Sequence, residues 1–124
     1  MARARHSLQR MLRACGHSLH GLRIGWRHET ALREEMLLGV VLLPLSFWLG
    51  RDALDVALLN GSLVMLMVTE LFNSAIEALT DRISTEHHEL SGRAKDYAAA
   101  AVFLVFLLML SVWGTITYLR FAAS

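Results

Sequence analysis

Three long apolar stretches, separated by short polar segments, set the pattern of this chain. They cover about residues 31–50, 53–80 and 97–119. A helix needs ~20 predominantly apolar residues to cross a bilayer, and the second and third stretches exceed that length. The first stretch has a shorter apolar part and contains Pro44, so it must tilt or extend into its charged flank to span. The pattern predicts an all-α membrane protein with three transmembrane helices.

A soluble three-helix bundle is the alternative for such an apolar chain. Residues 102–110, Val-Phe-Leu-Val-Phe-Leu-Leu-Met-Leu, have no polar face to turn toward water, and a surface helix of a soluble protein needs one. Composition agrees with a membrane protein, because 55% of the 124 residues are hydrophobic and the mean hydropathy is +0.44. We expect one domain over residues 1–124. Cys15 is the only cysteine, which excludes an intrachain disulfide and a zinc site built on thiolates.

The segment before the first apolar stretch, about residues 6–28, has a different pattern. Apolar residues such as Leu12 and Leu19 recur at helical spacing, and Arg13 falls on the opposite face. An amphipathic helix with arginines on its polar side lies in the membrane interface. No apolar h-region precedes Met36, so the segment is not a signal peptide. We therefore expect an N-terminal amphipathic surface helix.

The cations are unevenly distributed, and this predicts an orientation. The polar loop expected at residues 81–96 carries Arg82, Arg93 and Lys95, whereas Arg51 is offset by two nearby aspartates. The positive-inside rule therefore places the N-terminus and this loop in the cytoplasm, and the first loop and the C-terminus on the far side. The N-terminal arginines that support this orientation are Arg3, Arg5, Arg10, Arg13, Arg23, Arg27 and Arg33.

The second apolar stretch carries polar side chains that are unusual inside a membrane. Glu70, Asn73 and Glu77 are spaced i, i+3 and i+7, so they share one face of a helix. Ionisable groups at bilayer depth are costly and usually mark a functional site. Structural roles stay open for single members, with Glu70 as a protonated packing residue, Asn73 as a contact between helices and Glu77 as a partner of Arg82. The three residues as a set favour chemistry.

Several kinds of catalytic site do not fit this sequence. Ser74 lies off the face of the two glutamates, which argues against a serine triad. His88-Glu89 lacks the second histidine of the zinc-protease motif. Gly92 stands alone, without the other glycines of a phosphate-binding loop. No feature indicates a nucleic-acid partner. The candidate reaction that remains is phosphoryl transfer without a standard nucleotide-binding fold.

The polar residues suit that chemistry. Mg²⁺ is usually bound by one or two carboxylates together with substrate phosphates, and Glu29 and Glu77 both lie near the cytoplasmic ends of expected helices. Glu70 lies roughly 10 Å deeper, at 1.5 Å per residue, where a base can serve a lipid hydroxyl. Lys95 and Arg10 would neutralise phosphate charge.

A long stretch around the acidic residues resembles a known family. Glu70-Leu-Phe-Asn73-Ser-Ala-Ile-Glu77-Ala, then Asp81-Arg82, then Glu86-His-His-Glu89-Leu-Ser-Gly92-Arg-Ala-Lys95-Asp96 is similar to the signature of the bacterial integral-membrane diacylglycerol kinases. Residues 14–23, 26–29 and 33–35 match as well. The similarity runs without apparent gaps from about Arg10 to the C-terminus.

This resemblance implies a homotrimeric bundle of three-span subunits, each with its surface helix, in the bacterial inner membrane. It implies Mg²⁺-assisted transfer of phosphate from ATP to diacylglycerol at the cytoplasmic face, giving phosphatidic acid. Glu70 would be the catalytic base, Asn73 would support it, and Glu29 and Glu77 would bind Mg²⁺. The implied ATP-binding residues are Arg10, His17, Glu29, Glu77, Glu86, His87, His88, Lys95 and Asp96. The implied lipid contacts are Ala14, Cys15, Gly16, His17, Ser18, Leu19, Arg23, Ile24, Gly25, Trp26, Ala31, Leu32, Arg33, Glu34, Glu35, Trp48, Leu49, Gly50, Arg51, Glu70, Ala99, Trp113, Gly114, Thr115, Ile116, Thr117 and Tyr118.

The chain departs from the family pattern at three positions. His17 stands where an aromatic residue is common, Ala99 replaces a hydroxyl that contacts lipid, and Val56 stands where a basic residue can occur. Two other functions are alternatives. One is the related undecaprenol kinase, which shares the acidic helix, and the other is a small transporter that uses Glu70 as a proton relay. The stretch from Glu86 to Arg93 favours the diacylglycerol branch.

Overall fold

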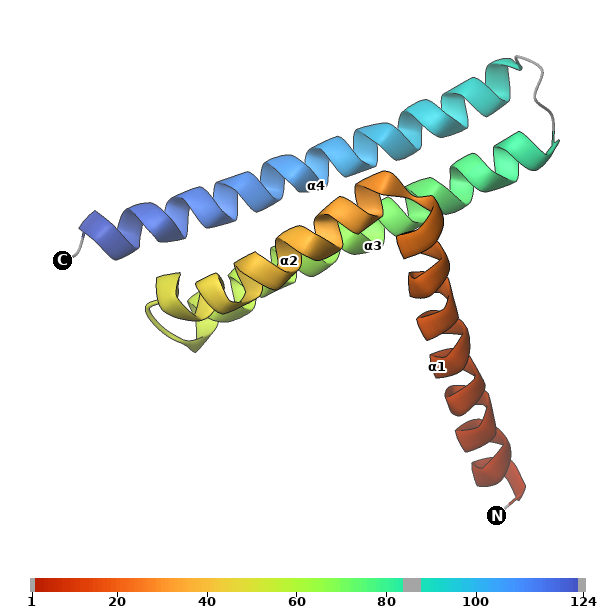
Figure 1. Cartoon of the computed structure of the whole chain (residues 1–124), viewed down its shortest axis with the longest axis horizontal. Coiled ribbons are helices and arrows are strands. Elements are labelled where there is room, and N and C mark those ends of the chain that lie inside the picture. The colour runs from red at the N-terminus through yellow and green to blue at the C-terminus, as the bar shows by residue number, and fades with distance from the viewer. Residues whose placement is uncertain (1, 84–87, 123–124) are drawn as a thin grey trace.

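The computed structural model describes residues 2–83 and 88–122, and these residues form four helices with short connections. Figure 1 shows three helices running side by side and the N-terminal helix projecting away from them. The predicted all-α architecture is therefore confirmed for the described part of the chain. The helices are α1 (Ala2–His28), α2 (Thr30–Leu49), α3 (Ala53–Ile83) and α4 (Glu89–Ala122).

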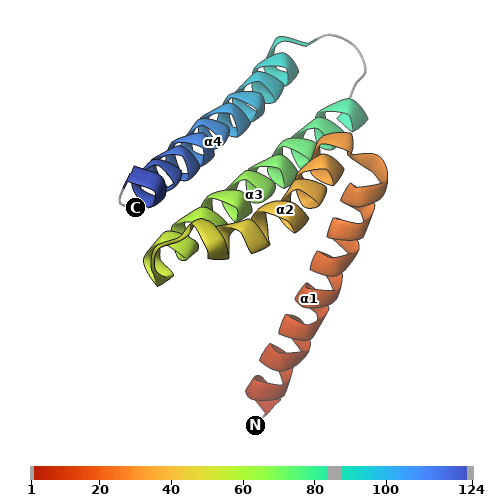
Figure 2. The same cartoon turned by 60° about the vertical axis from the view of Figure 1, so that its left-hand side comes forward.

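Helices α2 and α4 pack against α3 and form an open bundle with it. Helix α4 packs along α3, α2 lies against α3, and α2 and α4 touch each other only slightly (Figure 2). Helices α3 and α4 are long and apolar enough to cross a membrane, and only 11% of the most apolar part of α4 is buried within the chain. Such an exposed apolar helix needs lipid or another subunit around it. Helix α2, with 20 residues, is not among these two candidates, and a third span stays a prediction.

A small core closes the end of the bundle where α2 turns into α3. Leu49, Leu59 and Ile116 form it. Hydrogen bonds connect the helices around this core. The hydroxyl of Ser46 on α2 contacts Oδ1 of Asn60 on α3 at 3.0 Å, and the indole N–H of Trp113 on α4 donates to the carbonyl oxygen of Leu59 on α3 at 3.2 Å. Such bonds between helices contribute about 0.6 kcal/mol on average in membranes. Packing, these hydrogen bonds and the ion pair between Arg51 and Asp55, 2.7 Å apart, hold this end together.

A compact corner joins α1 to α2. The guanidinium of Arg33 donates to the carbonyl oxygens of Trp26 at 2.8 Å and Arg27 at 3.0 Å, which have no partner within their own helix end. The same guanidinium lies 5.7 Å from the ring centroid of Trp26. Gly25 is buried here, and a Cβ at its position would overlap the side chain of Leu32. The corner therefore fixes how α1 leaves the bundle.

The structure corrects the expected ends of three helices. Helix α3 continues to Ile83 and α4 begins at Glu89, so most of the loop expected at residues 81–96 is helical. Helix α1 begins at Ala2 instead of near residue 6. Hydropathy indicates where a helix leaves the apolar phase, whereas backbone hydrogen bonds decide where it ends, and polar residues can continue a helix into water. Pro44 lies within α2, which continues through it.

Candidate active site

The polar end of α3 gathers carboxylates from two helices. Glu70 is buried, with 9% of its surface exposed. Its carboxyl group is in hydrogen-bonding contact with that of Glu35 on α2. The charges of Glu77 and Glu29 also act on Glu70, so both lie in its neighbourhood. Glu35 on α2 therefore contacts Glu70, and Glu29 and Glu77 lie close enough for their charges to act on it.

Helix geometry explains this gathering. Glu70, Asn73 and Glu77 lie on one face of α3, as the spacing predicted. Glu29 is the N-cap residue of α2, with φ −114° and ψ 108°, and its side chain makes no capping hydrogen bond. Its carboxylate is therefore not engaged by the end of its own helix. The short connection between α1 and α2 brings Glu29 to the end of the bundle that carries Glu77.

Asn73 connects the acidic residues on α3. Its amide nitrogen is in hydrogen-bonding contact with Glu70 and lies 3.5 Å from Oε1 of Glu77, which is a long contact. Its carbonyl oxygen is buried without a hydrogen-bond partner, and so is Oε2 of Glu35. A buried oxygen without a partner is unusual in a folded protein and calls for a ligand, an ion or a water. The site therefore has two oxygen atoms available to a bound group.

These donors suit a hard cation. Among residues 2–83 and 88–122, no group of three or more His, Cys, Asp or Glu side chains could hold a metal ion. Mg²⁺ does not need such a group, because it is bound by one or two carboxylates and completes its octahedron with waters and phosphate oxygens. Glu29 and Glu77 provide the two carboxylates, and Asn73, whose amide nitrogen faces Glu77, has a free oxygen atom. The residues present fit Mg²⁺.

Lys95, the only lysine of the chain, lies near this end on α4. Its ammonium donates to Oδ1 of Asp81 on α3 at 2.6 Å. This contact raises the pKa of Lys95, and the charge of Glu77 acts in the same direction. No sequence pattern predicts the contact between Asp81 and Lys95, because the two residues are on different helices and their pairing depends on how α3 meets α4.

Some of the predicted ATP-binding residues lie elsewhere. Arg10 and His17 are exposed on α1, which points away from the bundle (Figure 1). Arg10 is 19 residues before Glu29, about 28 Å along a helix. The structure of one chain therefore does not bring Arg10 to the acidic residues. Asp96 and His88 are exposed, and the imidazole Nδ1 of His88 accepts from the backbone N–H of Leu90 at 3.1 Å. Glu86 and His87 lie outside the described residues.

The predicted lipid contacts fall into separate regions. Residues 14–19 and 23–26 are on α1, and residues 31–35 begin α2 beside Glu70. Residues 48–51 and 113–118 lie at the opposite end of the bundle, where Arg120 on α4 stands 5.9 Å from the Trp48 ring. Ala99 is exposed on α4. One chain does not assemble these residues into a single pocket, and Glu35 is the one whose side chain is shown in contact with Glu70.

Comparisons with known proteins cover nearly the whole chain. The family described as "Prokaryotic diacylglycerol kinase" matches residues 16–117. The diacylglycerol kinase of Haemophilus influenzae is 42% identical over 111 residues, which is 90% of this chain and 94% of that protein. The diacylglycerol kinase of Escherichia coli K12 is 39% identical over 121 residues, covering 98% and 99%. That of Pseudomonas aeruginosa PAO1 is 42% identical over 109 residues, covering 88% and 89%.

Proposed function

The chain belongs to the prokaryotic diacylglycerol kinase family, and we propose on this basis that it transfers the terminal phosphoryl group of ATP to the free hydroxyl of diacylglycerol. It is a lipid kinase with apolar membrane helices. The observation that supports the proposed site best is the burial of Glu70 between α2 and α3, in contact with Glu35 and Asn73. A base in that position meets a hydroxyl that approaches from the bilayer.

The mechanism assigns each residue a step. The carboxylate of Glu70 accepts the proton of the lipid hydroxyl as the hydroxyl oxygen attacks the terminal phosphorus of ATP. A new oxygen–phosphorus bond forms, the bond to the bridging oxygen breaks, and ADP leaves. Asn73 holds Glu70 in place through its amide nitrogen. Lys95 donates to phosphate oxygens.

Glu29 and Glu77 would hold Mg²⁺ with the nucleotide phosphates. The ion supplies charge neutralisation on the phosphate oxygens when it is bound. The ATP contacts carried over from the family are Arg10, His17, Glu86, His87, His88, Lys95 and Asp96.

The proposed assembly is a homotrimer of three-span subunits in the inner membrane of the bacterium. Helix α2 would be the third span, and α1 would lie in the cytoplasmic interface with its arginines toward phosphate headgroups. The concentration of arginines before Glu34 supports a cytoplasmic active site. The apolar outer surfaces of α3 and α4 support burial by lipid or by neighbouring subunits.

One assay tests the proposed reaction. Purified protein in mixed micelles receives ATP labelled at the terminal phosphate, Mg²⁺, and equal amounts of dioleoylglycerol and undecaprenol. We expect label in phosphatidic acid, with little in undecaprenyl phosphate. Preferential labelling of undecaprenol would assign the chain to the related lipid kinase activity, and no labelled lipid at all would refute a lipid kinase.

A further inference from the structure

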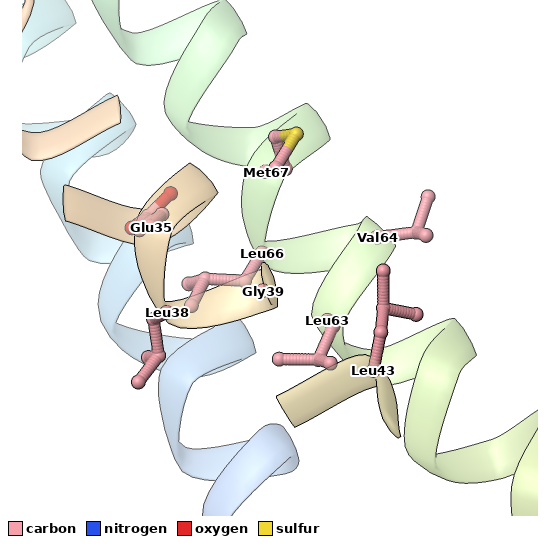
Figure 3. Close-up of a pocket in the computed structure, with 8 residues that line it drawn as sticks. All are labelled: Glu35, Leu38, Gly39, Leu43, Leu63, Val64, Leu66 and Met67. Atoms are coloured by element: carbon pink, nitrogen blue, oxygen red, sulfur yellow. The ribbon is translucent and has the colours of Figure 1, made fainter. Parts of the chain in front are cut away.

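The polar face of α1 is a surface that the proposed site leaves mostly unused. The apolar hollow between α2 and α3 ends at Glu35, which contacts Glu70, so it belongs to that site (Figure 3). Helix α1 instead projects away from the bundle (Figure 1), and its residues from Ala2 to Gly21 are all exposed. No other described helix covers this face, so whatever covers it comes from outside the single chain.

Five basic side chains form one line along this face, which we call the His–Arg stripe. They are spaced i, i+4, i+7, i+11 and i+14, a spacing that keeps residues on one side of a helix. Leu8, Met11, Leu12 and Leu19 occupy the opposite side, and each is 58% to 68% exposed. The stripe consists of His6, Arg10, Arg13, His17 and His20.

No carboxylate balances the charge of the stripe. Helix α1 contains no aspartate or glutamate, and Glu29, the next residue, is the first acid of the chain. In the described part of the chain, no ion pair involves a side chain of α1. A second copy of α1 would bring only like charge to this face. The partner that fits it is therefore anionic.

The charge of the stripe depends on pH. Histidine gains a proton between about pH 8 and pH 5, whereas arginine stays charged. The two arginines are thus permanent cations, and the three histidines add charge as the pH falls. Their charged neighbours one helical turn away are Arg3, Arg10, Arg13 and Arg23, and no titratable group of another described helix packs against them.

We propose that the His–Arg stripe is a pH-dependent contact with anionic phospholipid headgroups, in which protonated His6, His17 and His20 hold α1 against the membrane surface. This goes beyond the interfacial position of α1 proposed above, because it specifies the lipid charge and the protonation on which that position depends. Anionic headgroups favour the protonated imidazole. Docking therefore strengthens as the pH falls and weakens as the histidines lose their protons.

A nucleotide bound by a neighbouring chain is the other anion that could meet this face. The stripe spans 14 residues, about 21 Å along the helix, which is longer than one triphosphate. His6 and His20, toward its two ends, are not among the ATP contacts implied by the family. An extended anionic surface matches the whole stripe, whereas a nucleotide matches only Arg10 and His17.

Cys15 provides the reporter for a test, because it is the only cysteine and is exposed on the apolar side of α1. The full chain, spin-labelled at Cys15, is reconstituted into vesicles of phosphatidylcholine alone or with about 30% phosphatidylglycerol. Electron paramagnetic resonance, with oxygen and a water-soluble nickel chelate as relaxing agents, gives the ratio of immersed to water-exposed label. The matched variants are His6→Gln/His20→Gln, which is always neutral there, and His6→Arg/His20→Arg, which is always charged.

We expect this ratio to rise about fivefold or more from about pH 8 to pH 5.5 in the anionic vesicles, since one added charge has roughly that effect, and to stay unchanged in phosphatidylcholine alone. The glutamine variant should show a smaller rise, and the arginine variant should be immersed already at about pH 8. High salt should reduce the immersion.

Three results would overturn the contact: an equal rise in both kinds of vesicle, no rise in the anionic vesicles, or the same pH dependence in both variants as in the parent. Full immersion of the parent at high pH in phosphatidylcholine alone would also overturn it, because the apolar side of α1 would then suffice. The measurement uses neither ATP nor diacylglycerol, so a failure of the proposed kinase reaction is detected separately.

Discussion

At the scale of single residues, the site depends on how carboxyl groups share protons. Glu35 and Glu70 are in hydrogen-bonding contact, and two carboxyl groups in such contact hold a proton between them. The buried oxygen of Asn73 and Oε2 of Glu35 remain available to a ligand. These two oxygen atoms therefore mark where a lipid hydroxyl can bind.

Replacing the base tests its role directly. Glu70→Gln keeps the size and hydrogen-bonding capacity of the side chain but cannot accept the hydroxyl proton, so kcat should fall ~100- to ~10,000-fold while ATP binding is kept. Asp52→Asn is a matched control at the other end of α3, because Asp52 caps this helix by accepting from the N–H of Asp55 at 2.9 Å and asparagine caps equally well. Turnover close to the parent value in Glu70→Gln would rule out proton acceptance by Glu70.

The two proposed metal ligands give a second test at this scale. Glu29→Gln and Glu77→Gln each remove one anionic oxygen donor, so the Mg²⁺ concentration that supports half-maximal activity should rise by about 10-fold or more. The measurement is a Mg²⁺ titration of phosphatidic acid formation at saturating ATP and lipid. If both variants follow the Mg²⁺ dependence of the parent, the two carboxylates do not share the ion.

At the scale of elements, the sequence predicts what lies within one helix better than what joins two. Glu70, Asn73 and Glu77 were predicted to share a face because helical spacing alone decides it. Contacts between helices depend on packing that no local sequence pattern encodes. The contacts of Glu35 with Glu70 and of Asp81 with Lys95 are examples. Helix ends were missed for a related reason, since α3 and α4 continue past their apolar stretches.

The corner between α1 and α2 allows a prediction at this scale. Gly25→Ala adds a methyl group that would overlap Leu32, which is fully buried, so one side chain must shift at a cost of about 1–3 kcal/mol. Gly21→Ala is the matched control, because no atom lies within 4 Å of its added Cβ and alanine favours a helix by about 1 kcal/mol over glycine. Thermal unfolding in detergent should show a lower Tm for Gly25→Ala and an equal or higher Tm for Gly21→Ala. Equal Tm values for both variants and the parent would contradict a packed corner.

At the scale of the whole molecule, one chain does not bring all the residues of the proposed site together. The acidic residues and Lys95 lie at one end of the bundle, whereas Arg10 is on a helix that leads away from it. The apolar outer surface of α4 is almost entirely exposed in a single chain. Both observations are explained if neighbouring copies pack against the bundle and α1 of one subunit reaches the phosphates bound by another. The homotrimer that the family resemblance implies would allow this arrangement. The sequence alone did not decide whether neighbouring subunits share a site.

Mixing two inactive variants tests whether sites are shared. Glu70→Gln lacks the base and Arg10→Ala lacks a cation for phosphate, so each homotrimer should have low activity. If Arg10 acts on the site of a neighbouring chain, subunits exchanged in detergent form mixed trimers in which some sites contain both an intact Glu70 and an intact Arg10. We expect the mixture to regain up to about a quarter of parent activity, since in equal mixtures each of two independent residues is intact in half of the positions. A matched mixture of Glu70→Gln with Glu77→Gln should show no recovery, because both residues lie on the same face of one helix and belong to the same site. Absence of recovery in the first mixture, with subunit exchange verified by tagged chains, would mean that Arg10 serves the site of its own chain.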